Sequence, residues 1–225
     1  MGSLLTLTSH TSVVRLNATQ ALGAHGRLVG NVLGSSFHRR GEDEIVVARQ
    51  ERDYAQDPSS LHKLVAGLAY EHDWADQRWS SSTAVKYFGY TSRGFGKLDS
   101  DTYLETEQTR QHLGANQLLR WQLAPAWALK ASYEYATRLP DEYELFGEGI
   151  LVRANPALQP ETSHNANLEV QYVRPRWSAE VSGFVRGADN VIYQPPSIRD
   201  TQNQNLLKSR TLGPRHLCAT CRCRY

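Results

Sequence analysis

The chain has 225 residues, a formal net charge of +2 and three cysteines, all after residue 217. This small charge, with no basic stripe of interleaved aromatic residues, argues against a nucleic-acid partner. The mean hydropathy is -0.53, and no stretch approaches the about 18 consecutive apolar residues of a membrane helix, so a helical membrane protein is excluded. A membrane β-barrel is not excluded, because its strands are apolar on only one face.

The N-terminal residues 1–10 lack the basic region and the apolar run of a secretory signal. As written, the chain has no route across a membrane, and for an exported protein this predicts a fragment of a longer sequence. The body of the chain has no cysteine, which fits an exported β protein without a disulfide framework.

Alternating apolar and polar residues predict paired strands from residue 14 onward. A weaker hairpin over residues 14–32 turns at 23–26, and three stronger hairpins turn at 75–78, 124–126 and 174–176. In every strand one parity is apolar and the other polar, which is the period-two pattern of a sheet with two different faces. The apolar parity includes Leu64, Ala66, Leu68, Tyr70, Val85, Tyr87, Leu113, Ala115, Leu119, Leu129, Ala131, Tyr133, Tyr135, Ala166, Leu168, Val170, Ala179, Val181 and Val185.

The lengths of the strands and of their connections both favour a membrane barrel. Each strand has roughly 10 to 14 residues, more than the about 5 or 6 of ordinary strands and enough for the about 9 to 11 of a tilted membrane-spanning strand. The short turns alternate with long connections at 39–60, 93–110, 138–162 and 187–203. Outer-membrane barrels have this asymmetry, with tight turns on one side and long loops on the other.

All the tryptophans flank the short turns. Tryptophan prefers the boundary between hydrocarbon and water, so we expect a membrane interface at this end of the sheet. These interface residues are Trp74, Trp79, Trp121, Trp127 and Trp177. The apolar parity also contains His72, Ser81, Gln117 and His164, and of these Gln117 lies in mid-strand without an explanation in the sequence.

Residues 131–170 carry motif residues in two dense runs. The first is Arg138, Pro140, Glu144, Leu145, Phe146 and Gly147, and the second is Asn155, Pro156, Leu158, Pro160, Glu161, Asn165 and Glu169. This segment resembles the late-barrel portion of TonB-dependent outer-membrane receptors, in which a strand, a loop and a further strand carry these residue types at this spacing. Residues 208–213 resemble the start of a later strand in that family.

The chemistry of the same residues indicates a loop between two strands. The three prolines cannot donate to a strand ladder and therefore interrupt it, and the step from Asn155 to Pro156 forms turns readily. Arg138 and Glu144 could pair within the loop or with the barrel wall. We expect the motif residues to shape a loop that re-enters the barrel rather than to touch a ligand.

The resemblance implies a function as well as a fold. Members of that family are transporters in the outer membrane of Gram-negative cells, where a globular plug fills a barrel of about 22 strands. Membership implies contact with outer-membrane lipid, a TonB-type inner-membrane energy-coupling protein, and a scarce small ligand such as siderophore-bound iron or cobalamin. The sequence does not identify the ligand.

The chain departs from that pattern, because it has no plug and about eight complete strands where the family barrel has about 22. We therefore expect residues 1–213 to form an all-β, antiparallel, up-and-down segment of a transmembrane β-barrel, which is incomplete and does not transport alone. Residues 214–225 lose the alternation and gain cysteine and arginine, which predicts an out-of-frame or disordered tail.

Two other protein classes stay open. One is a soluble extracellular β-sandwich that binds a partner through the 39–60 and 138–162 loops, and the other is a small self-contained outer-membrane barrel. An enzyme is not expected, because no GxSxG or HExxH motif is present. Neither a cofactor nor a metal is expected, because His216, Cys218, Cys221 and Cys223 are spaced too closely for zinc ligand pairs.

Overall fold

The structure is a computed structural model that describes residues 5–43, 58–74, 78–97, 103–147, 151–175, 178–197 and 201–217. The strands of its large sheet are β1 (Leu5–Leu22), β2 (Gly26–Asp43), β3 (Ser59–Asp73), β4 (Trp79–Lys97), β5 (Tyr103–Ala124), β6 (Trp127–Arg138), β8 (Glu161–Val173), β9 (Ser178–Tyr193) and β11 (Gln204–Leu217). The remaining elements are α2 (Glu142–Phe146), β7 (Val152–Arg153) and β10 (Thr201–Gln202).

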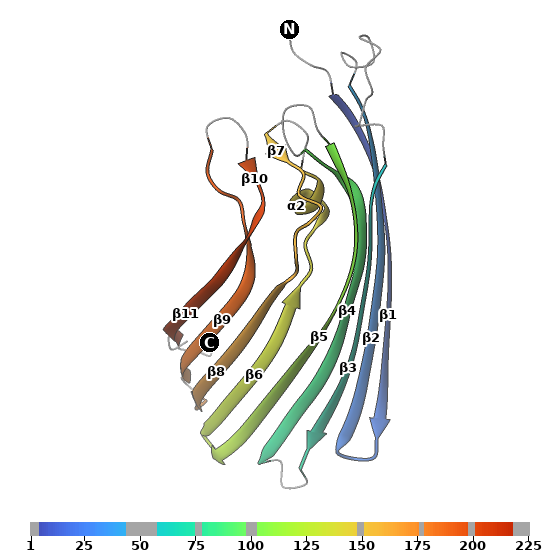
Figure 1. The fold of residues 1–225 in the computed structure, drawn as a ribbon. Coiled ribbons are helices and arrows are strands. Elements are labelled where there is room, and N and C mark those ends of the chain that lie inside the picture. Colours follow the sequence, from blue (N-terminus) through green and yellow to red (C-terminus); the bar gives the residue numbers. More distant parts are fainter. Residues whose placement is uncertain are drawn as a thin grey trace, which may run out of the picture.

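The nine strands form one antiparallel sheet in the order β1-β2-β3-β4-β5-β6-β8-β9-β11, and β7 pairs with β10 in parallel. Each strand therefore lies beside its neighbour in the chain, and the sheet curls around a concave face (Figure 1). Within the described residues β1 and β11 pair on one side only, so the barrel is open. The predicted all-β, up-and-down barrel segment is confirmed, with nine strands rather than about eight.

The described residues form no second large sheet that could stack on this one, as the β-sandwich alternative requires. The helix α2 has five residues. In the part of the chain that the structure describes, no helix has the length and apolar character needed to cross a membrane.

The strands are longer than their sequence pattern predicts. β4 and β5 pair from Trp79–Trp121 to Lys97–Tyr103, so their connection is much shorter than the predicted 93–110. Similarly, β2 reaches Asp43 and β3 begins at Ser59, within the predicted 39–60 connection. The alternation of side chains stops where the apolar face ends, whereas the backbone ladder continues because its hydrogen bonds do not depend on side-chain polarity.

The register confirms the predicted parity of the strands. Val85 lies opposite Leu68 on β3 and opposite Ala115 on β5. Leu68, Val85 and Leu113 are 49%, 57% and 68% exposed on the convex face. The segment that contains α2 lies over the opposite, concave face (Figure 1). The buried core is there, where Phe37, Leu61 and Tyr90 pack with Leu145 and Phe146 of that segment.

The last strand continues past the predicted domain boundary at residue 213. β11 pairs with β9 as far as Leu217 opposite Glu180. Pro214 lies within it, opposite Gly183, and proline is tolerated there because β11 has no described neighbour on its other side. Residues 218–225, with all the cysteines, lie outside the described residues, so the nature of this tail stays a prediction.

Candidate functional site

The candidate site is the infolded loop, which comprises the described residues 139–147 and 151–160 between β6 and β8. It folds over the concave face at the end of the sheet opposite the short turns (Figure 1). Its α2 helix and the short strand β7 lie in this segment. Most of the predicted motif residues fall in it or at its two ends.

An apolar cluster joins the infolded loop to the wall. Leu145, Phe146 and Leu158 from the loop pack with side chains of β2, β3 and β4. Phe146 stacks on Phe37 of the wall, with ring centroids 6.0 Å apart and planes inclined by 10°. Leu145 and Leu158 are 0% and 1% exposed, so the loop is packed against the barrel interior and excludes water there.

Two glycines make the close packing of Phe146 and its neighbours possible. A Cβ at Gly94 of β4 would lie 2.7 Å from Cε1 of the Phe146 ring. A Cβ at Gly147 would lie 2.0 Å from the carbonyl oxygen of Val152. Gly147 also has a φ of 59°, which other residues rarely adopt. The motif glycine is therefore required by the path of the loop.

The start of α2 is fixed by a capping box. The Asp141 carboxylate accepts a hydrogen bond from the Glu144 backbone N–H at 2.7 Å, and the Glu144 carboxylate accepts one from the Asp141 N–H at 2.9 Å. Together they satisfy two donors that the first turn of a helix leaves free. The Asp-x-x-Glu pattern is visible in the sequence, although the all-β expectation contained no helix here.

Arg138 connects the two ends of the infolded loop. Its guanidinium donates to both oxygens of Glu144 at 3.0 Å and to Oε1 of Glu161 at 2.7 Å. Oε1 of Glu161 also accepts from the backbone N–H of Ile192 on β9 at 2.6 Å. Of the two pairings that the sequence left open for Arg138 and Glu144, the structure has the one within the loop, and it adds Glu161 and β9.

The same contacts shift the protonation equilibria of this cluster. Burial raises the pKa of Glu161, but the hydrogen bonds from Arg138 and Ile192 and the positive charge of Arg138 outweigh it, so the net pKa is lowered. The hydrogen bond to Glu161 is the main reason that the pKa of Arg138 is raised. Both groups are therefore ionised at neutral pH, as an ion pair requires.

Side chains of the wall satisfy the carbonyl groups of the infolded loop. Arg39 of β2 donates to the carbonyls of Phe146 and Gly147, both at 2.6 Å, and its guanidinium lies 5.6 Å from the centre of the Phe146 ring. Tyr90 of β4 donates to Leu158 O at 3.0 Å. Buried backbone carbonyls need such partners because water does not reach them.

Gln108 of β5 holds the second half of the infolded loop. Its side-chain amide donates to the carbonyls of Pro156 and Leu158 at 2.6 and 3.0 Å. Pro140 and Pro160, whose side chains are among the most buried of the chain, have no backbone N–H that would need a partner. The motif prolines therefore suit a buried loop as well as a break in the strand ladder.

The connection between β9 and β11 is tied to the infolded loop by asparagines. Asn155 donates to Asn203 O at 2.7 Å, and Asn203 donates to Glu144 O at 3.2 Å. Asn205 exchanges two hydrogen bonds with the backbone of Gln159, at 2.9 and 3.0 Å. The two segments thus form one hydrogen-bonded layer over the concave face.

Two motif residues lie away from this layer. Asn165 donates to Ser163 Oγ at 3.2 Å, and Glu169 pairs with Lys130 at 2.6 Å, both on the concave face further along β8. Conversely, no sequence pattern indicated a role for Arg39, Gln108, Asn203 or Asn205. These residues come from strands and connections remote from the motif, and only the register of the sheet brings them to it.

Aromatic pairs occupy the short-turn end of the sheet. Trp79 lies opposite Trp121, and their rings stack at 4.8 Å with planes inclined by 5°. Trp127 meets Tyr172 edge to face at 4.6 Å. The ring of Trp74 lies 4.8 Å from that of His72. Trp177, which the sequence also predicts at this end, lies outside the described residues.

The outward polar residues have partners on the same face. Thr83 Oγ1 donates to Gln117 Oε1 at 2.6 Å across β4 and β5, and the Gln117 amide donates to Leu118 O at 3.1 Å. His164 Nδ1 lies 2.7 Å from the Tyr133 hydroxyl. These contacts account for Gln117, which the sequence left unexplained. Within the described residues, no group of His, Cys, Asp and Glu side chains has a geometry that could hold a metal ion.

Residues 54–213 match the family described as TonB dependent receptor-like, beta-barrel. The chain belongs to the TonB-dependent receptor family. The resemblance of residues 131–170 to this family is thereby confirmed, and the match extends it over most of the predicted hairpins. Among functionally curated proteins, no sequence matches this chain.

Solved structures share the fold. The copper transporter OprC superimposes with a TM-score of 0.72 at 18% identity, over 93% of this chain and 36% of that one. A double mutant of the Serratia marcescens hemophore receptor HasR, in complex with HasA and heme, gives 0.61 at 17% identity, over 93% of this chain and 39% of the receptor. The FrpB iron transporter of Neisseria meningitidis gives 0.64 at 13%, over 94% and 34%.

At these identities the likeness shows the fold alone. The chain spans 34–39% of the length of these three proteins. It corresponds to part of a TonB-dependent receptor barrel, and the structural relatives are receptors and transporters rather than enzymes.

Proposed function

We propose that this chain forms part of the outer-membrane wall of a TonB-dependent receptor that takes up a scarce ligand, such as siderophore-bound iron or cobalamin. In this proposal the intact receptor supplies a plug and the remaining strands, and a TonB-type inner-membrane protein supplies the energy. The observation that carries the membrane placement is an apolar band on the convex face.

The strand register defines the extent of the apolar band. On β4 it runs from Trp79, stacked on Trp121, to Gly89, which lies opposite Leu64. Residues 79–89 provide the length that a tilted strand needs to cross the hydrocarbon core, about 9 to 11 residues. The next outward row is polar, because Thr91 lies opposite His62. An apolar band of membrane thickness between an aromatic and a polar boundary supports insertion in a bilayer.

The aromatic boundary of the apolar band falls at different rows of residues on successive strands, as expected for tilted strands. The row of Trp79 and Trp121 continues into Leu129 on β6, whereas the aromatic pair of that region, Trp127 and Tyr172, lies one row further toward the short turns. Strands of closed barrels tilt by about 35–45°, so a level boundary must cross successive strands at different residues. The stepped aromatic boundary supports such a tilt.

The concave face has the opposite character. It carries ion pairs such as Lys130–Glu169 and Arg27–Glu71, which suit a polar barrel interior. The infolded loop lies on this face at the long-loop end. In the proposed receptor this end is the external mouth, so the loop would narrow the entrance through which the ligand passes.

A pair of lysine substitutions tests the membrane placement. Val85→Lys puts a charge on the convex face in mid-band, at a cost of about 2–4 kcal/mol in a bilayer, whereas Ser82→Lys puts the same charge on the concave face of the same strand. The full chain, folded into phosphatidylcholine vesicles, should insert far less as Val85→Lys and normally as Ser82→Lys. Equal insertion of both variants would refute the proposed placement.

A further inference from the structure

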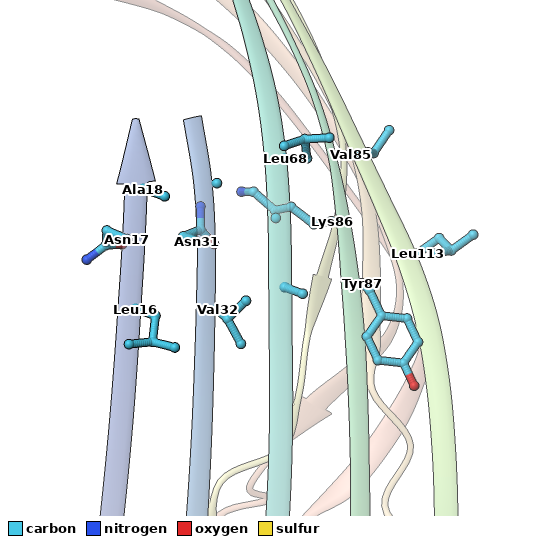
Figure 2. A pocket seen from close by; sticks show the side chains of 13 residues that line it. Leu16, Asn17, Ala18, Asn31, Val32, Leu68, Val85, Lys86, Tyr87 and Leu113 are labelled. Carbon is cyan, nitrogen blue, oxygen red and sulfur yellow. The ribbon is translucent and has the colours of Figure 1, made fainter. Parts of the chain in front are cut away.

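A hollow of about 490 Å³ lies on the convex face over β1–β5, within the apolar band. Its outward side chains are apolar, and they include Leu16, Val32, Leu68, Val85, Tyr87 and Leu113. Figure 2 shows Leu16 and Val32 beside each other on β1 and β2, and Leu68 and Val85 on the strands that follow. The hollow is therefore a shallow apolar groove on the face that we place in contact with lipid.

The groove includes Gly30 of β2, and Gly34, a second outward position of β2 without a side chain, lies beyond it toward the long-loop end. A Cβ at Gly34 would meet no atom within 4 Å, and a Cβ at Gly30 would meet only Leu68 Cδ1, at 4.0 Å. The flanking strands carry Val14 opposite Gly34 and Leu64 on its other side. In a bilayer this space must be filled, because an empty apolar groove loses dispersion contacts along both walls.

Hydrogen-bonding and cationic groups stand beyond Gly34, at the outer boundary of the band. His10 lies opposite His38, and the ring of His62 lies 5.1 Å from that of His38. Ser36 Oγ bonds His38 Nε2 at 3.1 Å. Arg40 follows on the same face of β2, and these side chains are exposed. We call His10, His38, His62 and Arg40 the histidine row.

The acidic groups that the structure describes on this face near the histidine row are Glu42, which lies beyond it on β2, and Glu105 and Glu107 on β5, where Glu107 lies opposite Arg93 of β4. Arg93 and Glu105 pair with each other on β4 and β5 at 2.6 Å. Glu42 lies one outward position beyond Arg40, further from the groove. The group next to the groove is thus a set of donors with a positive charge, which is complementary to an anion.

We propose that this face binds a phosphate-bearing lipid of the outer leaflet, with an acyl chain in the groove and the phosphate at the histidine row. With a rise of about 3.3 Å per residue, Gly34 lies roughly 13 Å along β2 from His38. Half of the hydrocarbon core is about 15 Å, so a chain whose phosphate is held at His38 extends along the groove past Gly34. This inference rests on the proposed membrane placement.

A lipid, rather than a protein partner, fits the shape and position of the groove. The groove lies inside the apolar band over β1–β5, and the histidine row stands at the outer boundary of that band. Arg and His donors form charge-assisted hydrogen bonds with phosphate oxygens. The polar side chains described within the band, such as Thr83, Gln117 and His164, have hydrogen-bond partners on the same face.

The test measures binding of dioleoyl phosphatidic acid to the full chain in neutral detergent by native mass spectrometry. Dioleoylglycerol has the same chains without the phosphate, and inorganic phosphate has the anion without the chains. We expect the phosphatidic acid to bind about tenfold more tightly than dioleoylglycerol, as the loss of charge-assisted hydrogen bonds implies. Inorganic phosphate should not displace it. Equal binding of dioleoylglycerol, or displacement by inorganic phosphate, would overturn the proposal.

Two variants and two matched controls locate the site. Gly34→Leu places a bulky side chain between the hollow and the histidine row, at a position where a Cβ meets no atom within 4 Å, and its control is Gly183→Leu on β9, where a Cβ also meets none. Replacement of the three histidines of the row by glutamine removes the histidine contacts to the headgroup and keeps Arg40, and its control is His164→Gln on β8. Both site variants should lose the preference for phosphatidic acid and both controls should keep it. Loss in the controls as well would overturn the proposal.

Insertion of the same proteins is measured separately, after folding into vesicles, by quenching of tryptophan fluorescence with brominated lipids. A chain that inserts but does not distinguish the two lipids overturns only this inference. A chain that does not insert contradicts the proposed function and this inference together. If the triple variant does not fold, the single variant His62→Gln is compared with His164→Gln instead, because it removes the histidine nearest to the groove.

Discussion

Arg138 and Glu161 form the last residue pair between β6 and β8, and the Arg138 guanidinium donates to Glu161 Oε1 at 2.7 Å. This contact closes the two strands at the point where the infolded loop leaves them. Glu144 receives the other hydrogen bonds of the guanidinium, so one side chain holds both strand ends and the α2 helix.

Loss of this arginine should loosen the infolded loop. In Arg138→Gln, Glu144 and the largely buried Glu161 lose charged partners, which is expected to cost about 1.5–3 kcal/mol. Urea unfolding of the chain in detergent measures the loss, and amide hydrogen exchange locates it in residues 139–147 and 151–160. The control is Arg27→Gln, whose ion pair with Glu71 is more exposed and is expected to contribute about 0–1 kcal/mol. Equal effects of the two substitutions would contradict the role of Arg138.

The ion pair between Arg138 and Glu161 should weaken in acid. The pKa of Glu161 is lowered in the folded chain, so its contribution is fully present above the unfolded carboxyl value of about 4.3 and is lost as the pH falls through the lower folded value. The urea midpoint of the wild type should therefore fall over this window more steeply than that of Glu161→Gln. Parallel pH profiles for the two proteins would show that Glu161 does not contribute in this way.

Gly94 and Phe146 should be energetically coupled. Gly94→Ala forces the Phe146 ring aside, because the new Cβ would lie 2.7 Å from Cε1. Phe146→Ala alone should cost about 3–5 kcal/mol through the cavity it leaves. In the double variant Gly94→Ala should be nearly neutral, which a double-mutant cycle measures. Gly187→Ala, at a position with nothing within 4 Å, is the control. Additive effects of Gly94→Ala and Phe146→Ala would contradict the packing described.

Ser92 and Gln108 are neighbours across β4 and β5 that should respond in opposite ways. Ser92 Oγ is buried and, among the described residues, has no hydrogen-bond partner, so Ser92→Ala should leave the stability unchanged or raise it. Gln108→Ala leaves the carbonyls of Pro156 and Leu158 without their shared donor, which should cost about 1–3 kcal/mol. Thermal unfolding in detergent compares them, and a marked loss of stability in Ser92→Ala would contradict this assignment.

The sequence predicts the wall of this structure well, because side-chain alternation and turn residues are local signals. The parity of Leu68, Val85 and Leu113 follows from period-two patterning, and the short turns follow from their composition. The ends of the strands cannot be predicted from these local signals. Beyond Gly89 the convex face of β4 becomes polar, so the pattern fades while the ladder to β5 continues to Lys97.

For the infolded loop, the sequence predicts the residues of the loop but not their partners on the barrel wall. Its own residues are recognisable from the sequence, and Arg138 with Glu144 is a pairing that spacing allows. The partners Arg39 and Gln108 lie far away in the chain, and no local pattern indicates that strand register brings them to the loop. Gln117 is a similar case, since its partner Thr83 is identified only once β4 and β5 are aligned.

The central claim is that the convex face is a membrane wall bounded by tryptophans, and the depth of these rings tests it most directly. The full chain is folded into vesicles of phosphatidylcholine brominated at a shallow, a middle or a deep acyl position, and tryptophan fluorescence is recorded. We predict the strongest quenching by the shallow bromines, because Trp74, Trp79, Trp121 and Trp127 would lie at the interface. Quenching that is strongest at the deep position, or absent at all three, would contradict the claim.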